Sequence, residues 1–247
     1  WLVSHLKDRV DRYDAVPTAN SIQSQGETRS AVKGKPLYSV YSYAWNGIDN
    51  NGDPLGTFGG ENSKEYAKII SNFQPDSLVF NGSGVPTWFG SVRNDLSLGP
   101  WSLSFNITYK LGYVFRRTST SINYTEVLAG RAHKDYLDRW KAPGDQMQTS
   151  VPALAYPSNT PRNTFYQYSS ALIERGDHIR LQDIRLAFDL GSVVKRLQSA
   201  QIYTYASNLG ILWRANKLGL DPDYVSVSSR NRLITPVSIS FGFRTSF

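Results

Sequence analysis

Hydrophobic and polar residues alternate strictly along residues 235–247. One parity is apolar, and the other holds small or polar residues and a single arginine. A period of two predicts a β-strand with one apolar face and one polar face. This polar face suits a water-filled lumen better than the solvent side of a β-sandwich. The apolar residues of the strand are Val237, Ile239, Phe241, Phe243 and Phe247.

A longer alternation begins at Trp101. Every second residue from Trp101 to Leu111 is apolar, and Tyr113 and Phe115 continue the same parity. One strand of this length would measure about 46 Å along its axis, or about 33 Å vertically at a 45° tilt. Strands in ordinary sheets average about 5 to 6 residues. The length therefore favours a membrane-spanning strand.

Several other segments have the composition of strands. Residues 178–190 change their apolar parity halfway, which predicts a bulge near Gln182–Asp183. Residues 1–10 fit either the end of a strand or a helical turn. The remaining strands are expected at 37–46, 86–98 and 201–210.

Some polar segments between the strands have helix or turn signals. Residues 64–70 are expected to form a helical turn, and residues 133–140 are helix-like. Asp49–Pro54 imitates the start of a calcium-binding loop, but Pro54 occupies position six and no glutamate follows at position twelve. A β-turn is the favoured interpretation there.

The connections alternate in length, which predicts a topology. Long loops on one side and short turns on the other are typical of outer-membrane β-barrels, and this pattern puts the Gly99–Pro100 turn on the periplasmic side. Six strands and the end of a seventh leave two open edges, which a bilayer does not tolerate, so further strands are expected before Trp1. From the C-terminus backwards, the connections are 211–232, 191–200, 116–177, 99–100, 49–85 and 11–35.

Composition agrees with an all-β chain. Aromatic residues make up 13% of the sequence, which fits interfacial belts and sugar-binding sandwiches equally well. The mean hydropathy is −0.38, but such averages miss barrels, whose strands are half polar. Absence of cysteine excludes disulfides and thiolate metal sites. The net charge of +7 is spread without a long basic run, so no nucleic-acid partner is expected.

Several segments follow one another in the order that a known family shows. Residues 37–54 resemble a strand and turn near the end of SusC/RagA-type TonB-dependent transporters, and residues 85–90 with 101–112 resemble the next hairpin of that family. Asp138–Arg–Trp140 with Pro143 resembles an "RW…P" loop. Residues 173–186 resemble "EDGSYLRLKNLTL", although Ile173–Glu–Arg replaces the acidic start. Two further matches are Ala206–Ser–Asn–Leu209 with Gly219–Leu–Asp–Pro222, which resemble "GQNL…GLDPE", and Phe243 with Phe247, which resemble a barrel-assembly signal.

This resemblance implies a location and partners. Residues 1–247 would be the C-terminal part of a 22-stranded transmembrane antiparallel barrel with long extracellular loops, and the plug and earlier strands would be absent. The whole protein would lie in the outer membrane of Bacteroidetes, import a glycan or oligopeptide without a cofactor, and contact outer-membrane lipid. It would be capped by a SusD-like surface lipoprotein and opened by the TonB–ExbB–ExbD complex through its N-terminal part.

Seven residues are candidate functional positions. Arg93, Asp95, Lys110 and Arg244 fall on polar parities, so they would line the lumen, either along a solute path or paired with one another or the plug. Aromatic side chains stack on sugar rings, but they also pack inside loops. The aromatic candidates for substrate contact are Trp88, Tyr136 and Trp140.

Two other protein classes compete with the transporter. A secreted carbohydrate-binding β-sandwich would have shorter strands and two apolar inner faces. An enzyme needs a base and a nucleophile within reach. The three histidines are scattered, no pair has metal-ligand spacing and no Gly-x-Ser-x-Gly motif occurs, so neither catalytic nor metal residues are predicted.

Overall fold

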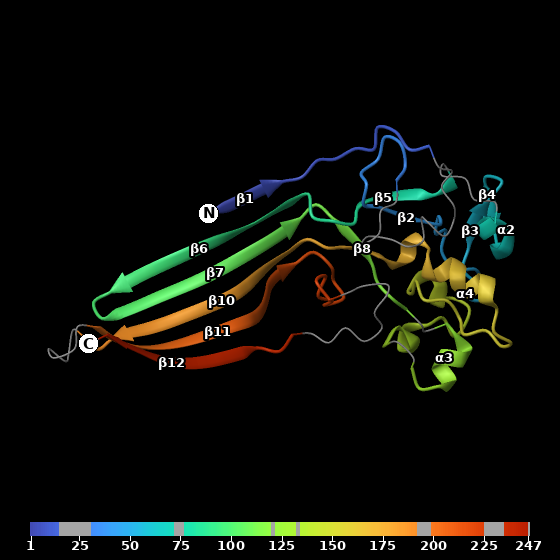
Figure 1. Ribbon diagram of the computed structural model, residues 1–247. Helices are drawn as coiled ribbons and strands as arrows, with labels where there is room; N and C mark the ends of the chain where they lie inside the picture. The colour runs from blue at the N-terminus through green and yellow to red at the C-terminus, as the bar shows by residue number, and fades with distance from the viewer. Residues whose placement is uncertain are drawn as a thin grey trace.

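The computed structural model consists of a large sheet with folded loops at one end (Figure 1). It describes residues 1–14, 31–71, 77–119, 122–131, 134–191, 199–224 and 235–246. Both chain ends lie at the sheet, and the segments between its strands supply the loops. The chain is therefore mostly β-structure with a few short helices, as the alternation predicted.

Six antiparallel strands form the large sheet, in the order β1-β6-β7-β10-β11-β12. Apart from the short strands that lie in the loops, each strand of the sheet pairs with the strand that precedes it and the strand that follows it in sequence. The sheet is therefore an up-and-down meander. The strands are β1 (Leu2–His5), β6 (Trp88–Leu98), β7 (Trp101–Leu111), β10 (His178–Asp189), β11 (Ser199–Arg214) and β12 (Ser238–Ser246).

The pairing register gives this sheet one apolar and one polar face. Residues directly opposite one another in paired strands share a face. One row across the apolar face runs through Leu96, Leu103, Leu186, Thr204 and Phe241. The adjacent row on the polar face runs through Asp95, Ser104, Arg185, Tyr205 and Ser240.

The apolar face is exposed. Leu98 is 82% exposed and Phe241 is 81% exposed. Within the described residues every other sheet has only two strands, so no second large sheet covers this face. A β-sandwich requires that second layer, and the sandwich interpretation therefore lacks its main structural element.

Aromatic residues mark both ends of the apolar face. At the end with the short turns, Trp101 meets Phe188 edge to face, with 4.7 Å between ring centroids. At the loop end, Tyr109 lies in one row with Trp213 through their common partner Ile179. Aromatic belts on both sides of an apolar band are typical of a lipid-facing surface.

The sheet differs from the sequence prediction in its members. Residues 37–46 were expected in the wall, but only Ser39–Ser42 form a strand, β2, which pairs with β5 (Val79–Ser83) among the loops. The short strand β1 takes the sixth place instead and pairs with β6. The β-rich composition of 37–46 was informative about strand formation but not about the partner.

Strand lengths also differ. The strand from Trp101 ends at Leu111, because Gly112 has a φ of +75° that breaks the ladder, and Val114–Arg116 form a separate strand, β8. Eleven residues give about 36 Å along the strand, which still suits a spanning strand. In the other direction, β11 was expected over 201–210 but extends to Arg214, opposite His178.

The predicted bulge in β10 is confirmed. The pairing of β10 with both β7 and β11 shifts between Leu181 and Asp183. The extra residue restores the apolar parity on one face, so Leu181 and Ile184 share the face that carries Ile107 and Phe105. A bulge at this position therefore keeps Arg180 and Asp183 on the polar face.

The two longest loops fold together into what we call the loop unit, the described parts of residues 31–87 and 112–177. Its strands pair within each loop, β2 with β5 and β3 with β4 in the first and β8 with β9 in the second, and the two loops meet where the Tyr43 N–H donates to the carbonyl oxygen of Tyr168 at 3.0 Å. Besides the strands given above, its elements are β3 (Gly56–Phe58), β4 (Glu61–Ser63), α2 (Tyr66–Ser71), α3 (Tyr124–Leu128), α4 (Thr160–Gln167) and β9 (Ile173–Arg175), with 3₁₀ turns at Lys134–Asp138, Asp145–Met147 and Ser170–Leu172.

The loop unit has its own hydrophobic core. Phe165 of α4 is fully buried and packs against Tyr43 and Tyr66 from the first loop. The predicted helical turn at 64–70 corresponds to α2. The helix-like segment 133–140 forms a 3₁₀ turn over 134–138, and His133 lies outside the described residues. No helix in the described part of the chain is long and apolar enough to cross a membrane.

Candidate functional site

The four residues predicted to line a lumen all belong to the polar face. Arg93 lies opposite Asn106, and its Nε is 3.9 Å from Asp95 Oδ1, with both side chains more than half exposed. Arg244 lies opposite Gln201 near the short-turn end. Lys110 is the member that enters a larger charged cluster. Whether the four residues contact a solute stays a prediction.

The charged cluster lies at the loop end of the polar face. Lys110 and His178 are cross-strand partners on β7 and β10. Lys110 Nζ is 2.6 Å from Asp223 Oδ1, and His178 Nε2 is 3.3 Å from Asp223 Oδ2. Arg180 Nη2 is 3.2 Å from the same Oδ2. Basic groups from two strands therefore surround one loop carboxylate.

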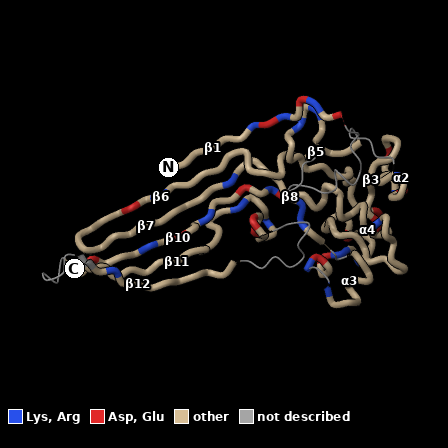
Figure 2. Tube along the Cα trace, in the orientation of Figure 1, with Lys and Arg blue, Asp and Glu red and all other residues tan. Residues whose placement is uncertain are grey.

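A second carboxylate joins this cluster. Arg180 Nη2 donates to both oxygens of Asp221, each at 2.6 Å. Asp221 Oδ1 in turn accepts the backbone N–H of Asp223 at 3.1 Å, which fixes the two acids relative to each other. Figure 2 shows charged positions gathered where β7 and β10 meet the loop that follows β11.

The electrostatics of the cluster favour an ionised Asp223. Burial alone would raise the pKa of its carboxyl group, but hydrogen bonds from His178 and Lys110, together with their charges, hold the pKa well below its ordinary value. The carboxylate is therefore the persistent anion around which the strands' basic groups are arranged.

Sequence reasoning identified Lys110 but missed its partners. Arg180 was visible on the polar parity of β10, and Asp221 and Asp223 flank a proline in a loop. Nothing in the local pattern says that this loop returns to the sheet. Only the fold brings residues 110, 178–180 and 221–223 together.

A stacked group on the polar face joins three strands. The Arg185 guanidinium lies 4.8 Å from the centroid of the Tyr203 ring and donates from Nη2 to Gln201 Oε1 at 2.6 Å. The Tyr203 ring covers Gly242, because a Cβ built on Gly242 would lie 2.2 Å from Tyr203 Cζ. This position requires glycine for close approach.

The three aromatic candidates do not form one surface. Trp88 lies on the apolar face of the sheet, opposite His5 and Leu111, and its ring stacks on His5 with 4.2 Å between centroids. Tyr136 and Trp140 lie in the loop unit instead. Trp88 thus has the position of a belt residue, and substrate contact by any of the three stays a prediction.

Trp140 and Tyr136 each have packing partners. Trp140 lies over Gly52, where an added Cβ would come within 2.5 Å of the indole, and its Nε1 donates to Gln146 Oε1 at 3.3 Å. The Arg139 guanidinium sits 3.9 Å from the centroid of the Tyr136 ring. Packing inside the loop unit accounts for both rings.

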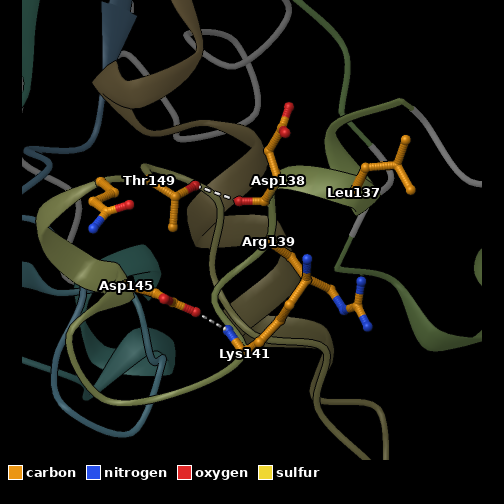
Figure 3. Close-up of a pocket in the computed structure, with 7 residues that line it drawn as sticks. Leu137, Asp138, Arg139, Lys141, Asp145 and Thr149 are labelled. Atoms are coloured by element: carbon orange, nitrogen blue, oxygen red, sulfur yellow. Dashed lines mark hydrogen bonds between the residues drawn. The ribbon is translucent and has the colours of Figure 1, made fainter.

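An open hollow of about 330 Å³ lies beside these aromatics (Figure 3). Thr149 Oγ1 donates to the carbonyl oxygen of Asp138 across it, at 2.5 Å. Asp145 Oδ2 accepts the backbone N–H groups of Lys141 and Ala142. Its lining is mostly polar, and two of its acceptors, Asp145 Oδ2 and the Asp138 carbonyl oxygen, already have donors within the loop unit. The lining residues are Leu137, Asp138, Arg139, Lys141, Asp145, Gln148 and Thr149.

The Asp49–Pro54 segment is a turn, as predicted. Asp49 Oδ1 accepts the backbone N–H groups of Asn51 and Asp53 at 2.9 and 2.8 Å. Lys64 Nζ lies 2.8 Å from Asp49 Oδ2 and 3.2 Å from Asp53 Oδ2. The Lys64 ammonium group and the Arg162 guanidinium, whose Nε is 2.8 Å from Asp53 Oδ1, thus balance these two carboxylates, and no group of potential metal ligands is found among the described residues.

The proposed assembly signal is only partly described. Phe243 lies on the apolar face opposite Ile202 and is 61% exposed. Phe247 lies outside the described residues.

Comparison with solved structures finds this fold in a peptide importer. The chain is similar to "RagAB peptide importer in the 'open-open' state" at 21% identity and a TM-score of 0.58, covering 85% of this chain and 22% of that chain. It is also similar to the RagAB peptide transporter, at 21% identity and a TM-score of 0.55, covering 78% of this chain and 20% of that chain. The likeness to the RagAB peptide importer in the 'closed-closed' state has 19% identity and a TM-score of 0.51, and it covers 74% of this chain and 20% of that chain.

These likenesses concern the fold. The chain spans about one fifth of the length of the structures it matches. No family model and no curated protein sequence matches it.

Proposed function

We propose that this chain forms a section of the barrel wall and extracellular loops of an outer-membrane, TonB-dependent nutrient transporter of the SusC/RagA type. The observation that carries the proposal is the single-layered sheet with an exposed apolar face. Leaving side chains such as Leu98 and Phe241 in water is costly. Lipid would cover them without a second protein layer.

The strand dimensions support a membrane location. β6 and β7 each have eleven residues and β12 has nine. A tilted strand needs about 9 to 11 residues to cross the hydrocarbon core. The aromatic rows at Trp101 and Tyr109 are eight residues apart, which corresponds to roughly 20 Å along the membrane normal at a 35–45° tilt.

The loop arrangement supports an orientation. The loop unit and the loop after β11 extend from one end of the sheet, whereas β6 and β7 are joined at the other end by Gly99–Pro100 (Figure 1). Long loops of such barrels face the outside. The loop unit would thus be extracellular, and the charged cluster would lie at the mouth of the lumen.

The partners follow from the proposed family. The free edges of β1 and β12 would pair with other strands of a 22-stranded barrel, since open edges are not tolerated in lipid. A SusD-like lipoprotein would cap the loops, and TonB–ExbB–ExbD would act through a plug. The similar structures are of a peptide importer, so oligopeptide is the cargo to test before glycan.

Transport of this kind would use binding and gating without a covalent step. On the polar face, Arg93, Asp95 and Arg185 would offer ionic and hydrogen-bonding contacts to a solute. Residues of the apolar face would contact lipid only. No enzymatic activity is proposed.

Cell fractionation tests the proposal. The intact protein that contains this chain should extract with outer-membrane detergent fractions, shift on a gel when boiled and co-purify with a lipoprotein. Uptake of labelled oligopeptides should require it. A protein that stays soluble, does not shift on boiling and binds polysaccharide alone would contradict the barrel.

A further inference from the structure

The charged cluster has the composition of a carboxylate receptor. Lys110, His178 and Arg180 present their polar heads from two neighbouring strands of a fixed sheet, and Asp223 lies within 3.3 Å of all three. Arg180 is buried to more than nine tenths of its surface. Its immobilised guanidinium is a pre-organised group of the kind that binds carboxylates with directional hydrogen bonds.

The present ligands of this receptor belong to a loop. Asp221 and Asp223 lie in residues 215–224, which form a compact turn of their own. Asn216 pairs with both the N–H and the carbonyl of Leu220 at 3.0 Å. The loop therefore has hydrogen bonds of its own. It is tied to the sheet by the carboxylate contacts, by the Tyr224 ring 5.9 Å from the Arg180 guanidinium, and by the Ala215 N–H, which donates to the carbonyl oxygen of Asp177.

Arg180 retains an unused donor. Its Nη2 serves both loop carboxylates, while the buried Nε has no hydrogen-bond partner. Binding through Nε and Nη2 together is a bidentate arrangement, which adds both energy and directionality to an arginine–carboxylate pair. The loop leaves that arrangement unfilled, so the site has the capacity to hold a better-placed carboxylate.

We propose that Lys110, His178 and Arg180 form a binding site for carboxylate groups of a solute, and that Asp221 and Asp223 occupy it as an internal competitor. Calling the ligand a transported solute rests on the proposed function; the binding chemistry does not. A solute bearing several carboxylates would displace the loop from the polar face. A neutral solute would leave it in place.

Binding to the intact, detergent-purified protein tests the site. The probes are a triglutamate peptide with its triglutamine analogue, and trigalacturonate with neutral maltotriose. These pairs separate carboxylate recognition from recognition of peptide or sugar. Residues 1–247 contain no cysteine, so Lys217→Cys, at an exposed loop position, carries a spin label that reports loop release once any cysteine elsewhere in the intact protein has been replaced.

The proposal predicts opposite effects for two variants. Asp221→Asn with Asp223→Asn should tighten binding of an acidic probe about tenfold or more, because a tethered competitor acts at roughly millimolar effective concentration. Arg180→Gln should weaken it at least tenfold. Arg131→Gln, which removes a positive charge from a mostly exposed side chain in the loop unit, should leave it unchanged.

Acidic probes should also mobilise the label at position 217, and neutral probes should not. Equal binding of acidic and neutral probes, or no tightening in the double variant while it still shifts on boiling, would overturn the inference. Failure of fractionation or uptake would instead contradict the transport role and leave the binding result intact. The response to triglutamate or to trigalacturonate identifies the source of the carboxylate.

Discussion

Arg162 of α4 donates from Nε to Asp53 Oδ1 at 2.8 Å, although the two residues are 109 positions apart. The same guanidinium donates from Nη2 to the carbonyl oxygens of Gly52 and Ala153. Arg162 is 2% exposed. One buried side chain thus ties the turn of the first long loop to two parts of the second, and the loop unit depends on it.

Replacing Arg162 with alanine should loosen the loop unit without unfolding the sheet. Removing one partner of a buried ion pair costs about 3 kcal/mol, because the carbonyls and the carboxylate lose their donor. Protease cleavage between residues 31 and 177 of the intact protein should increase, with the boiling shift retained. Arg162→Lys should restore part of the lost stability, since lysine keeps the positive charge but lacks the several fixed N–H donors of the guanidinium group.

Arg131→Ala is the control for this prediction. Its side chain is 62% exposed, whereas that of its partner Glu126 is 15% exposed, so the loss is expected to be smaller than for the Arg162 pair. If both alanine variants are cleaved equally, the buried pair does not hold the loops together.

Ile239 and Ser240 of β12 offer a matched test of the two faces. Ile239 lies in the central row with Ala206, Ile184 and Phe105 on the apolar face, whereas Ser240 lies on the polar face. An arginine at the bilayer midplane costs about 2 to 4 kcal/mol. Ile239→Arg should therefore reduce the amount of folded, heat-modifiable protein in the outer membrane.

Ser240→Arg adds the same side chain one residue away and should be tolerated, because a wet lumen solvates it. The readout is again the unboiled gel band. Equal loss in both variants, or greater loss for Ser240→Arg, would show that the apolar face is not the one in lipid.

The loop after β11 should open in acid. The pKa of Asp223 is lowered in the folded protein, so its stabilising effect is complete above the unfolded pKa of about 3.9 and is lost as the pH falls below that value. The mobility of a label at position 217 should rise between about pH 4 and pH 2. Asp223→Asn should reduce this rise, because only the Asp221 contacts with Arg180 are then left to be lost in acid, and the loop should already be more mobile at neutral pH.

Gly242→Val should disturb the last strand pair. The Tyr203 ring occupies the space that a Cβ would need, so the ring must leave both Gly242 and the Arg185 guanidinium. Overpacking of this kind costs about 1 to 3 kcal/mol. Thermal loss of the unboiled band should occur at a lower temperature. Ser240→Val, on the same face beside Tyr205, is the control and should change it little.

Local sequence was enough to identify the strands of the wall where alternation is strict. Trp101–Leu111 and the last strand were predicted because period two fixes which side chains share a face, whatever the partner strand. The β10 bulge was predicted for the same reason, since a change of parity needs an extra residue near Asp183. The resemblance to SusC/RagA transporters likewise rests on short local segments, which lie both in the wall strands and in the loops.

Partner choice was decided by tertiary structure. Ser39–Ser42 and Leu2–His5 are both short strands, yet only the second joins the wall, because strand pairing is a non-local hydrogen-bonding choice that side-chain pattern does not encode. The helices α3 and α4 were missed, since short helices stabilised by packing have weak periodicity. The sequence signals that could have indicated these helices are Asn123 and Asn159, whose side chains cap the N-termini of α3 and α4.

The sequence by itself determined the all-β class, the two-faced strands and the polar parity of Arg93, Asp95, Lys110 and Arg244. These follow from covalent geometry and short-range alternation. Only the tertiary structure decided that Trp88 lies between His5 and Leu111 and that Asp223 returns to Lys110, His178 and Arg180. Loop return depends on the summed packing and ion pairing of distant residues, which no single segment specifies.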